Sequence, residues 1–377
     1  MKVLYISHDA RLYGAPKSLL ECVRGIKKKG IEPIVVMPSA GGLQMELDRS
    51  KIENVIIPYY SCVYLGEYRA KDYAKYIWTN YKAVIRIMRL IRKERIELVH
   101  TNSLAVSVGA VAAYLMKIPH VWHFREYLKE DFGFKRLNEG TVRKLVRNSK
   151  CCIAIAEGIE RKYRKEYGIK PVRLYDGIEC ESYEYPVNLE ENVKETPELL
   201  IAGAISEGKG QWDAVRAVEI LANRGLEVHL SIVGNGAPAM LKALKRYVRR
   251  KNLTEYITIR PFTSKLQKLR IQSTIVLVCS KMEALGRVTA EAMLSGKIVI
   301  GTDTGGTLEL IGKNEERGYL YRYDHPEELA KKIEYVLQNR QEVIKKEKEA
   351  QMFIKNLTDM DHYTDRMLQI YKKAVIK

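Results

Sequence analysis

The sequence predicts an α/β fold built from two doubly wound parallel-sheet domains. The chain has 377 residues, more than one hydrophobic core usually supports, so two domains are expected. Short apolar runs rich in β-branched residues alternate with helical patterns, as in parallel sheets whose two faces are covered by helices. A polar, acidic segment at residues 179–198 interrupts this alternation, which then starts again. The interruption indicates the boundary between the domains.

The first half of the chain contains six apolar runs that we expect to be strands. They lie at residues 3–6, 33–37, 55–58, 98–101, 120–123 and 151–156. Helical patterns fill several of the intervals between them, at residues 15–29, 72–94 and 157–167. Strands that alternate with helices in this way predict one parallel sheet.

The second half repeats the pattern. Its expected strands are residues 199–203, 229–234, 257–261, 275–279 and 298–302. In doubly wound sheets ligands bind at the carboxyl ends of the strands, so a ligand shared by two such domains belongs in the cleft between them. The final segment, 359–377, carries Tyr363, Met367, Ile370 and Tyr371 at helical spacing, so one face of it should be buried.

Composition and charge exclude several classes of protein. A hydrophobic fraction of 46% with 29% charged residues excludes a disordered or fibrous chain. The longest mainly apolar run, 104–116, is too short to span a membrane, the first residues do not resemble a signal peptide, and the six cysteines show no metal or disulfide spacing. We therefore expect a cytoplasmic protein with reduced thiols. The net charge of +18 is concentrated up to Cys180, where 33 basic residues face 19 acidic ones, which suggests an anionic partner.

Two glycine-rich turns have weak phosphate-binding character. Residues 203–210 nearly match a Walker A loop, but Gly210 stands where a Ser or Thr should hold magnesium, so a nucleoside triphosphatase is disfavoured. Lys209 on this turn is still a plausible diphosphate contact; the alternative is a solvated lysine. Residues 234–239 match the dinucleotide fingerprint G-x-G-x-x-A, but in the second strand–helix unit of their domain, and Pro238 favours a simple helix-starting turn.

A third signal follows the predicted strand at residues 275–279. Glu283 precedes a predicted helix and Glu291 lies in its second turn. Gly286 allows close backbone approach, while Arg287 adds a cation beside the free N–H groups of the helix start. Carboxylates accept hydrogen bonds from sugar hydroxyls and a helix start receives phosphate, so the segment fits a nucleotide sugar. Spacing alone leaves open that both glutamates are ordinary surface residues.

The sequence EALGRVTAE, from Glu283 to Glu291, resembles the E-x7-E motif of the GT4 family of retaining glycosyltransferases, which have the GT-B fold. The resemblance covers the whole chain. It implies two Rossmann-like domains facing a cleft: an acceptor-binding domain of residues 1–178 plus 359–377, and a nucleotide-sugar-binding domain of residues 179–358. The final helix would return onto the first domain.

The resemblance also implies roles for single residues. Lys209, in EGKGQ, matches the family's phosphate-binding lysine, and His123 matches its active-site histidine. The residues expected to act in catalysis are His123, Glu283 and Lys209, and those expected to bind the donor are Gly14, Ala15, Lys209, Gly286, Arg287, Val288 and Glu291. Two departures stand out: Ala204 replaces an arginine that many members carry, and Leu285 replaces a common aromatic residue.

The implied reaction transfers a sugar from a UDP-, GDP- or dTDP-sugar with retention of configuration, in cell-surface polysaccharide or glycolipid synthesis. Lys209, Arg287 and the helix start would oppose the charge that develops on the diphosphate. No residue clearly serves as a double-displacement nucleophile, so a front-face mechanism fits better. GT-B enzymes usually need no metal, so we expect no metal or cofactor and interpret Asp359-Met-Asp361, which contains D-x-D, as a helix cap.

Two alternatives remain open, a nicotinamide-dependent oxidoreductase and a noncatalytic protein that binds anionic surfaces. Within residues 72–94, Lys82, Arg86, Arg89 and Lys93 form one basic stripe, which is either a solvated helix face or a surface for anionic lipid. It would attract a lipid-linked acceptor; a saccharide acceptor is the other possibility. Nucleic acid is disfavoured because no nucleic-acid-binding motif accompanies the charge. We expect the protein to attach peripherally to the inner membrane face by electrostatic attraction, without insertion.

Overall fold

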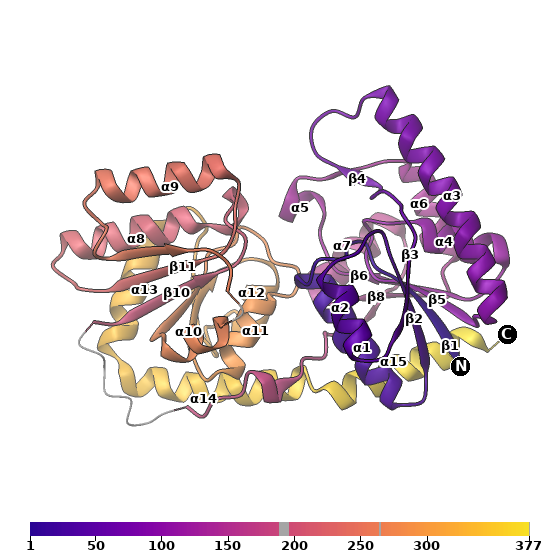
Figure 1. Cartoon of the computed structure of the whole chain (residues 1–377). Helices are drawn as coiled ribbons and strands as arrows, with labels where there is room; N and C mark the ends of the chain where they lie inside the picture. Colours follow the sequence, from indigo (N-terminus) through magenta and orange to yellow (C-terminus); the bar gives the residue numbers. More distant parts are fainter. Residues whose placement is uncertain (188–195, 264, 377) are drawn as a thin grey trace. The chain divides into compact units, whose positions relative to one another are not determined.

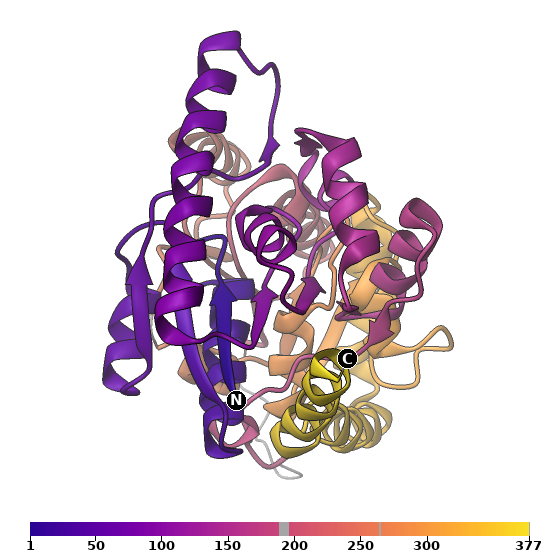
Figure 2. The same ribbon diagram turned by 90° about the vertical axis from the view of Figure 1, so that its right-hand side faces the viewer.

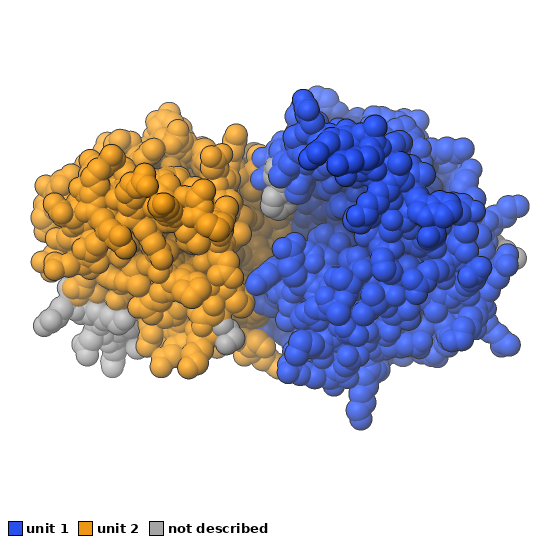
Figure 3. Space-filling model, turned by 45° about the horizontal axis from the view of Figure 1, so that its top comes forward, with its two compact units in different colours: residues 1–179, 358–377 blue, residues 180–357 orange. Residues whose placement is uncertain are grey.

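The computed structural model describes residues 1–187, 196–263 and 265–376. The chain divides into two compact units, which are shown in different colours in Figure 3: unit 1 comprises residues 1–179 and 358–377, and unit 2 comprises residues 180–357. These bounds lie one residue from the predicted ones. Most of the acidic segment predicted as the boundary, residues 188–195, lies outside the described residues.

Unit 1 contains a seven-stranded parallel sheet in the order β3-β2-β1-β5-β6-β8-β9. Its strands are β1 (Lys2–Ile6), β2 (Glu32–Met37), β3 (Glu53–Ile56), β5 (Leu98–Thr101), β6 (His120–Phe124), β8 (Cys151–Ala154) and β9 (Val172–Arg173). Each of the six predicted strands overlaps one of them. The sequence analysis missed β9 and a separate antiparallel pair, β4 (Val63–Tyr64) and β7 (Lys135–Arg136), because two-residue strands carry no apolar period.

Helices cover both faces of this sheet (Figures 1 and 2). They are α1 (Gly14–Lys28), α2 (Gly42–Arg49), α3 (Ala70–Glu94), α4 (Val108–Met116), α5 (Lys129–Phe132), α6 (Glu139–Asn148), α7 (Glu157–Tyr167) and α15 (Met360–Val375). Alternate strand residues enter two separate cores, as the two-residue period of a strand requires. Val3 and Tyr5 pack with α1, α2 and α15, whereas Leu4 and Ile6 pack with α3 and α4.

The last helix, α15, belongs to unit 1, as predicted. Tyr363, Met367, Ile370 and Tyr371 are all buried. The Tyr371 hydroxyl shares a hydrogen bond of 2.6 Å with His100 Nδ1 and donates one of 3.0 Å to the Tyr5 hydroxyl. Asp359 caps the helix, since its Oδ1 accepts a hydrogen bond of 2.6 Å from the His362 amide. The end of the chain therefore completes the core formed by its beginning.

Unit 2 contains a six-stranded parallel sheet in the order β12-β11-β10-β13-β14-β15. Its strands are β10 (Glu198–Ala202), β11 (His229–Val233), β12 (Ile257–Arg260), β13 (Ile275–Val278), β14 (Ile298–Thr302) and β15 (Tyr319–Tyr321). The helices are α8 (Gln211–Asn223), α9 (Pro238–Arg250), α10 (Leu266–Gln272), α11 (Arg287–Leu294), α12 (Gly305–Ile311), α13 (Pro326–Gln338) and α14 (Arg340–Leu357). All five predicted strands are present; β15 was missed.

Strand order places a switch point in each sheet. In unit 2 the chain runs outward in both directions from the β10–β13 pair, and in unit 1 from β1–β5. In open α/β sheets the loops after such a pair of strands diverge and leave room for a ligand. A ligand is therefore expected at the loops after β10 and β13, or at those after β1 and β5. Among the helices that the structure describes, none is long and apolar enough to cross a membrane.

The packing of α15 generates a first prediction. Met367→Ala should lower the free energy of unfolding by about 2–5 kcal/mol, because Met367 is fully buried between α15 and the sheet of unit 1. Met352→Ala is the matched control; Met352 is 65% exposed on α14, so its loss should cost less than about 0.5 kcal/mol. Urea unfolding followed by circular dichroism measures both. Equal midpoints for the two variants would show that α15 does not stabilise unit 1.

Candidate functional site

In unit 2 the loops after β10 and β13 lie against each other. The Lys281 amide donates a hydrogen bond of 2.9 Å to the Gly208 carbonyl, which joins the two loops. Lys209 Nζ lies 2.5 Å from Glu283 Oε1, and both side chains are partly exposed. The structure thus brings together Lys209 and Glu283, which are far apart in the sequence, at the switch point of this sheet.

Gly210 explains why this turn is not a Walker A loop. Its φ is +64°, and a Cβ there would lie 1.9 Å from the Cys279 carbonyl oxygen. No Ser or Thr can occupy this position without moving the backbone of the neighbouring loop. The position that would supply a magnesium ligand is therefore used for close packing.

The glycines of the G-x-G-x-x-A match have a packing role as well. A Cβ on Gly234 would lie 1.7 Å from the Gly203 carbonyl oxygen, and one on Gly236 would lie 2.5 Å from that of Ile205. The loops after β10 and β11 therefore need both glycines in order to approach, and Ile205 and Gly236 form a β-bridge. Pro238 begins α9, as predicted. Backbone packing accounts for the fingerprint without a dinucleotide.

The start of α11 is shaped by glycine backbones. Gly286 is the residue before the helix, with φ +80°, and Arg287 and Val288 occupy the first turn. The Gly306 amide at the start of α12 donates a hydrogen bond of 2.8 Å to the Glu283 carbonyl. A Cβ on Gly306 would lie 2.3 Å from the Leu285 carbonyl, so the beginning of α12 packs tightly on the Glu283 loop. Leu285 itself is buried, which agrees with a packing role for this departure.

Glu291 is held by two arginines. Arg270 Nη2 donates to its Oε2 at 2.8 Å, and Arg287 Nε donates to its Oε1 at 3.1 Å. The Arg270 side chain is only 2% exposed, so this is a desolvated ion pair whose orientation is fixed. The sequence analysis missed Arg270, because it lies on α10, outside every motif. Its one local signal is a charged residue between Leu269 and Ile271.

In unit 1, His123 lies in β6, next to Arg125 at the carboxyl end of that strand. Arg125 is buried and makes two hydrogen bonds of 2.7 Å to the carboxylate of Asp176. Its Nε donates at 2.6 Å to Asn102 Oδ1, and the Asn102 amide in turn donates at 3.0 Å to the carbonyl of Ala15. A single buried cation therefore ties together the ends of β5 and β6, the start of α1 and the Asp176 loop. Sequence reasoning missed Asp176.

The contacts of His123 define its protonation state. Its Nδ1 lies 3.3 Å from Arg125 Nη2, which can only donate, so Nδ1 accepts and the proton resides on Nε2. That Nε2 is buried and has no hydrogen-bond partner among the described residues. Burial, with Arg125 and His100 nearby, holds the pKa of His123 well below its usual value. His123 is thus a neutral imidazole with an unused donor and is not a cation.

Gly14 and Ala15 form the first turn of α1. Gly14 has φ +43°, which favours glycine, and a Cβ there would meet open space. The first turn of α1 contains no acidic residue, so its free N–H groups and the positive end of the helix dipole are not offset locally. The feature predicted to approach phosphate is therefore at a helix start, at the switch point of unit 1.

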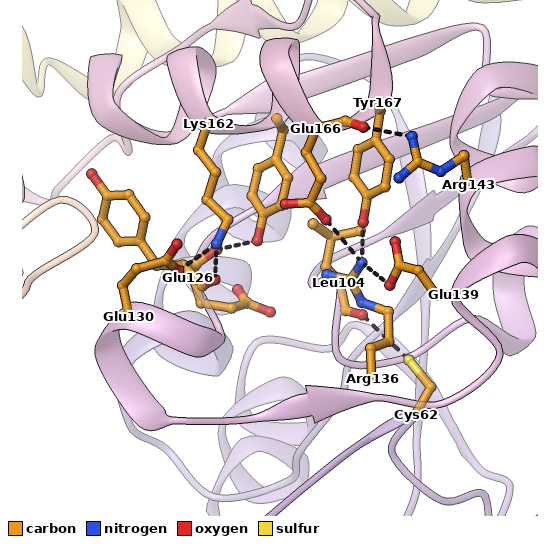
Figure 4. Close-up of polar contacts among 12 residues, drawn as sticks. Cys62, Leu104, Glu126, Glu130, Arg136, Glu139, Arg143, Lys162, Glu166 and Tyr167 are labelled. Carbon is orange, nitrogen blue, oxygen red and sulfur yellow. Dashed lines mark hydrogen bonds and ion pairs between the residues drawn. The ribbon is translucent and has the colours of Figure 1, made fainter.

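Glu126, directly after Arg125, belongs to a larger polar network (Figure 4). Its Oε1 accepts a hydrogen bond from the Ser103 hydroxyl, and burial raises the pKa of its carboxyl to about 7. Lys162 on α7 donates to the Tyr127 carbonyl at 2.7 Å and pairs with Glu130. Arg136 in β7 pairs with Glu139 at 2.9 Å and with Tyr167. These bonds attach the segment after β6 to α6 and α7.

Metal-binding and disulfide chemistry have no support in the described part of the chain. It contains no group of three or more His, Cys, Asp or Glu residues placed to hold a metal ion. Asp359 caps α15, and Asp361 pairs with Lys29 at 3.3 Å, so the D-x-D sequence has structural contacts. All six cysteines are free.

The pKa of Glu126 generates a second prediction. The pKa of this carboxyl is about 4.5 in the unfolded chain and about 7 in the folded protein. The free energy of unfolding therefore falls by about 3 kcal/mol in total as the pH rises from 4.5 to 7. Glu126→Gln keeps an acceptor for Ser103 but cannot ionise. We expect this variant to melt above the parent at pH 8 and close to it at pH 5, with Glu67→Gln, a change at an exposed residue of the same unit, as the control. A difference that does not depend on pH would refute the assignment.

Comparison with known sequences supports one family across the chain. Residues 13–182 match the family described as Glycosyltransferase Family 4, and residues 188–359 match Glycosyl transferases group 1. An uncharacterized glycosyltransferase of Methanocaldococcus jannaschii is 24% identical over 311 residues, which are 78% of either chain. A D-inositol 3-phosphate glycosyltransferase of Paenarthrobacter aurescens is 28% identical over 140 residues, 36% of this chain and 34% of that one.

Solved structures show the same architecture. The Anabaena protein HepE, crystallised in complex with UDP and glucose, superimposes with a TM-score of 0.83 at 19% identity, and 99% of both chains is covered. A glycosyltransferase from Rickettsia africae gives a TM-score of 0.81 at 22% identity, with 99% of this chain and 98% of that chain covered. The predicted GT-B fold is confirmed. The chain belongs to the GT4-type glycosyltransferases.

Proposed function

We propose that this protein transfers a sugar from a nucleotide diphosphate sugar to an acceptor with retention of the anomeric configuration. The observation that carries the proposal is the contact of 2.5 Å between Lys209 and Glu283 at the switch point of unit 2. It places a cation suited to phosphate beside a carboxylate suited to sugar hydroxyls. HepE has been solved with UDP and with UDP-glucose, which supports a nucleotide-sugar donor for a chain of this fold.

The donor would occupy the carboxyl ends of β10 and β13. When the glycosidic C–O bond breaks, negative charge develops on the departing diphosphate. Lys209 and the N–H groups of Gly286, Arg287 and Val288 at the start of α11 would stabilise that charge. Glu283 would accept hydrogen bonds from the transferred sugar. Ala204, where many relatives carry an arginine, is exposed on the loop after β10 and supplies no cation.

Glu291 would accept hydrogen bonds from the ribose of the nucleotide. Arg270 and Arg287 fix its carboxylate, so its orientation is set before the donor binds. Arg287 is already paired with Glu291, and its role in the proposal is to position this carboxylate and to add positive charge at the start of α11. The nucleotide of the donor would be UDP, GDP or dTDP.

Unit 1 would bind the acceptor. The neutral His123 would donate its Nε2–H to an oxygen of the sugar, and the start of α1 at Gly14 and Ala15 would face phosphate. The leaving phosphate would take the acceptor proton in a front-face reaction, because no carboxylate is assigned as a covalent nucleophile. The acceptor would be a saccharide or an anionic, lipid-linked glycan precursor, and the basic stripe on α3 would attract the inner membrane face.

The donor site generates a third prediction. Lys209→Ala and Glu283→Gln should each lower turnover by about 10²-fold or more, because each removes charge or orientation that acts in the transition state. Lys331→Ala and Glu255→Gln change exposed residues of the same unit and serve as controls.

A thermal-shift panel with UDP, GDP and dTDP first identifies the nucleotide, and NADH is the test of the oxidoreductase alternative. Glu291→Ala should weaken nucleotide binding more than it slows turnover.

Two outcomes would contradict the proposed function. Full activity in both Lys209→Ala and Glu283→Gln would remove the donor site from the switch point of unit 2. Stabilisation by NADH with no response to any nucleotide diphosphate would favour the oxidoreductase. Retention itself is read from the anomeric proton signal of the first product formed, and inversion would exclude the front-face reaction.

The tautomer of His123 generates a fourth prediction. His123→Ala should reduce turnover at least about tenfold while leaving nucleotide affinity unchanged, because the donor phosphates are assigned to other residues. His362→Ala, a change on the exposed surface of α15, is the control. A loss of nucleotide affinity equal to the loss of turnover would instead assign His123 to ground-state binding.

A further inference from the structure

The N-terminal part of α3 exposes large apolar side chains. Ile77 is 45% exposed, Trp78 59% and Tyr81 57%, and Leu65 in the preceding segment is 61% exposed. Figures 1 and 2 show this end of α3, with the loop from β4, projecting beyond the sheet of unit 1. Large apolar side chains gathered on one projecting element indicate a contact surface rather than scattered surface residues.

The helix has three distinct faces. Its core face is formed by Tyr76, Ala83, Val84, Ile87 and Ile91, all of which are buried. Met88 is partly buried against the same cluster. At 100° per residue the exposed apolar residues lie beside this core face. A row of exposed basic residues follows next around the helix: Lys71, Lys75, Lys82, Arg86, Arg89 and Lys93.

The apolar and basic rows are in contact. Lys82 Nζ lies 4.6 Å from the centre of the Trp78 ring, and the Trp78 and Tyr81 rings stack with their centres 6.1 Å apart. Residues 69–94 contain eight Lys or Arg and two acids, Asp72 and Glu94. Asp72 lies 3.9 Å from Arg69, and Glu94 lies 3.1 Å from Lys93. Most of the charge of the row is therefore uncompensated on α3 itself.

We propose that this surface, formed by Leu65, Ile77, Trp78 and Tyr81 with the basic row of α3, inserts into the interface of an anionic lipid bilayer. An amphipathic helix with aromatic and aliphatic side chains beside lysines matches the two layers of such an interface, the acyl boundary and the anionic headgroups. Nucleic acid would engage the cations without needing Ile77 or Leu65. A second copy of this chain would bring the same positive charge against itself. Charge complementarity together with the apolar ridge therefore favours lipid.

This inference differs from the electrostatic attachment without insertion that we expect from the sequence, and it does not depend on the donor chemistry. Electrostatic attachment needs only the basic row and leaves the tryptophan outside the acyl region. Insertion places Trp78 among the acyl chains. The two modes are distinguishable because Trp122 is fully buried and Trp212 is partly buried, so Trp78 is the exposed one of the three tryptophans.

The experiment measures binding of the full chain to vesicles of phosphatidylcholine containing about 30 mol% phosphatidylglycerol. Vesicles with brominated acyl chains, which quench tryptophan at short range, report the position of Trp78. We expect sedimentation with the vesicles, a blue shift of tryptophan emission, and quenching that Trp78→Phe abolishes while binding persists. Vesicles without phosphatidylglycerol should bind at least about tenfold more weakly.

Variants separate the two rows. The triple variant Ile77→Ser, Trp78→Ser, Tyr81→Ser should lose at least about tenfold in vesicle binding, most clearly at high salt, where charge is screened. The control is the pair Met45→Ser and Met352→Ser, which removes exposed apolar side chains of α2 and α14. Reversal of Lys82, Arg86, Arg89 and Lys93 to Glu should abolish binding to anionic vesicles while nucleotide binding is kept. Glu283→Gln should bind vesicles like the parent, so failure of the donor site leaves this test intact.

Three results would overturn the inference. Binding without quenching would show electrostatic attachment only. Equal vesicle binding by the triple variant and its control would place the contact elsewhere. Retention on immobilised RNA, without binding to vesicles, would assign the basic row to nucleic acid.

Discussion

The close approach of Gly210 to the Cys279 carbonyl is the constraint on which the candidate donor site depends. Because a Cβ at residue 210 would lie 1.9 Å from that oxygen, only glycine lets the turn after β10 lie on the end of β13. The Gly208 carbonyl then accepts from Lys281, and Lys209 reaches Glu283. A similar close backbone contact occurs at Gly306, after the next strand of the sheet, where α12 packs on the Glu283 loop. Backbone contacts, more than side-chain packing, therefore position the two residues that the proposed reaction needs.

In unit 1 a buried charge, that of Arg125, holds the candidate site residues in position. Arg125 is desolvated, and its contacts with Asp176 and Asn102 offset the cost of removing it from water. Its Nη2 also determines the tautomer of His123, so one cation fixes both a loop and a proton position. Removing Asp176 would leave an unpaired buried charge and disturb His123, although the two side chains contact each other only through Arg125. Positioning and electrostatics are coupled here through a single guanidinium.

The sequence predicted the strands that contain a recognisable apolar run and missed the strands that are too short to contain one. The eleven expected strands are all present because each buries an apolar run, whereas β4, β7 and β9 span two residues each and are too short for any pattern. The pairing of Lys209 with Glu283 is consistent with the resemblance to the family. The sequence analysis did not find Arg270 or Asp176, because each pairs with a residue far away in the chain. Arg270 is 21 residues from Glu291, and Asp176 is 51 residues from Arg125. Such residues come together only through the order of the strands in the sheet, and a short stretch of sequence gives no information about that order.

The exposed basic row of α3 lies apart from the buried strand ends of unit 1. At the strand ends of unit 1, burial lowers the pKa of His8 to about 4 and holds those of His100 and His123 well below the usual value, so these imidazoles are neutral. Arg125 is offset by Asp176. A row of exposed cations with few acidic neighbours lies on α3 instead, where it is solvated. Unit 1 thus has two polar regions of different character: neutral, desolvated imidazoles at the strand ends, whose contacts act at short range, and an exposed basic face, whose field reaches further into solvent.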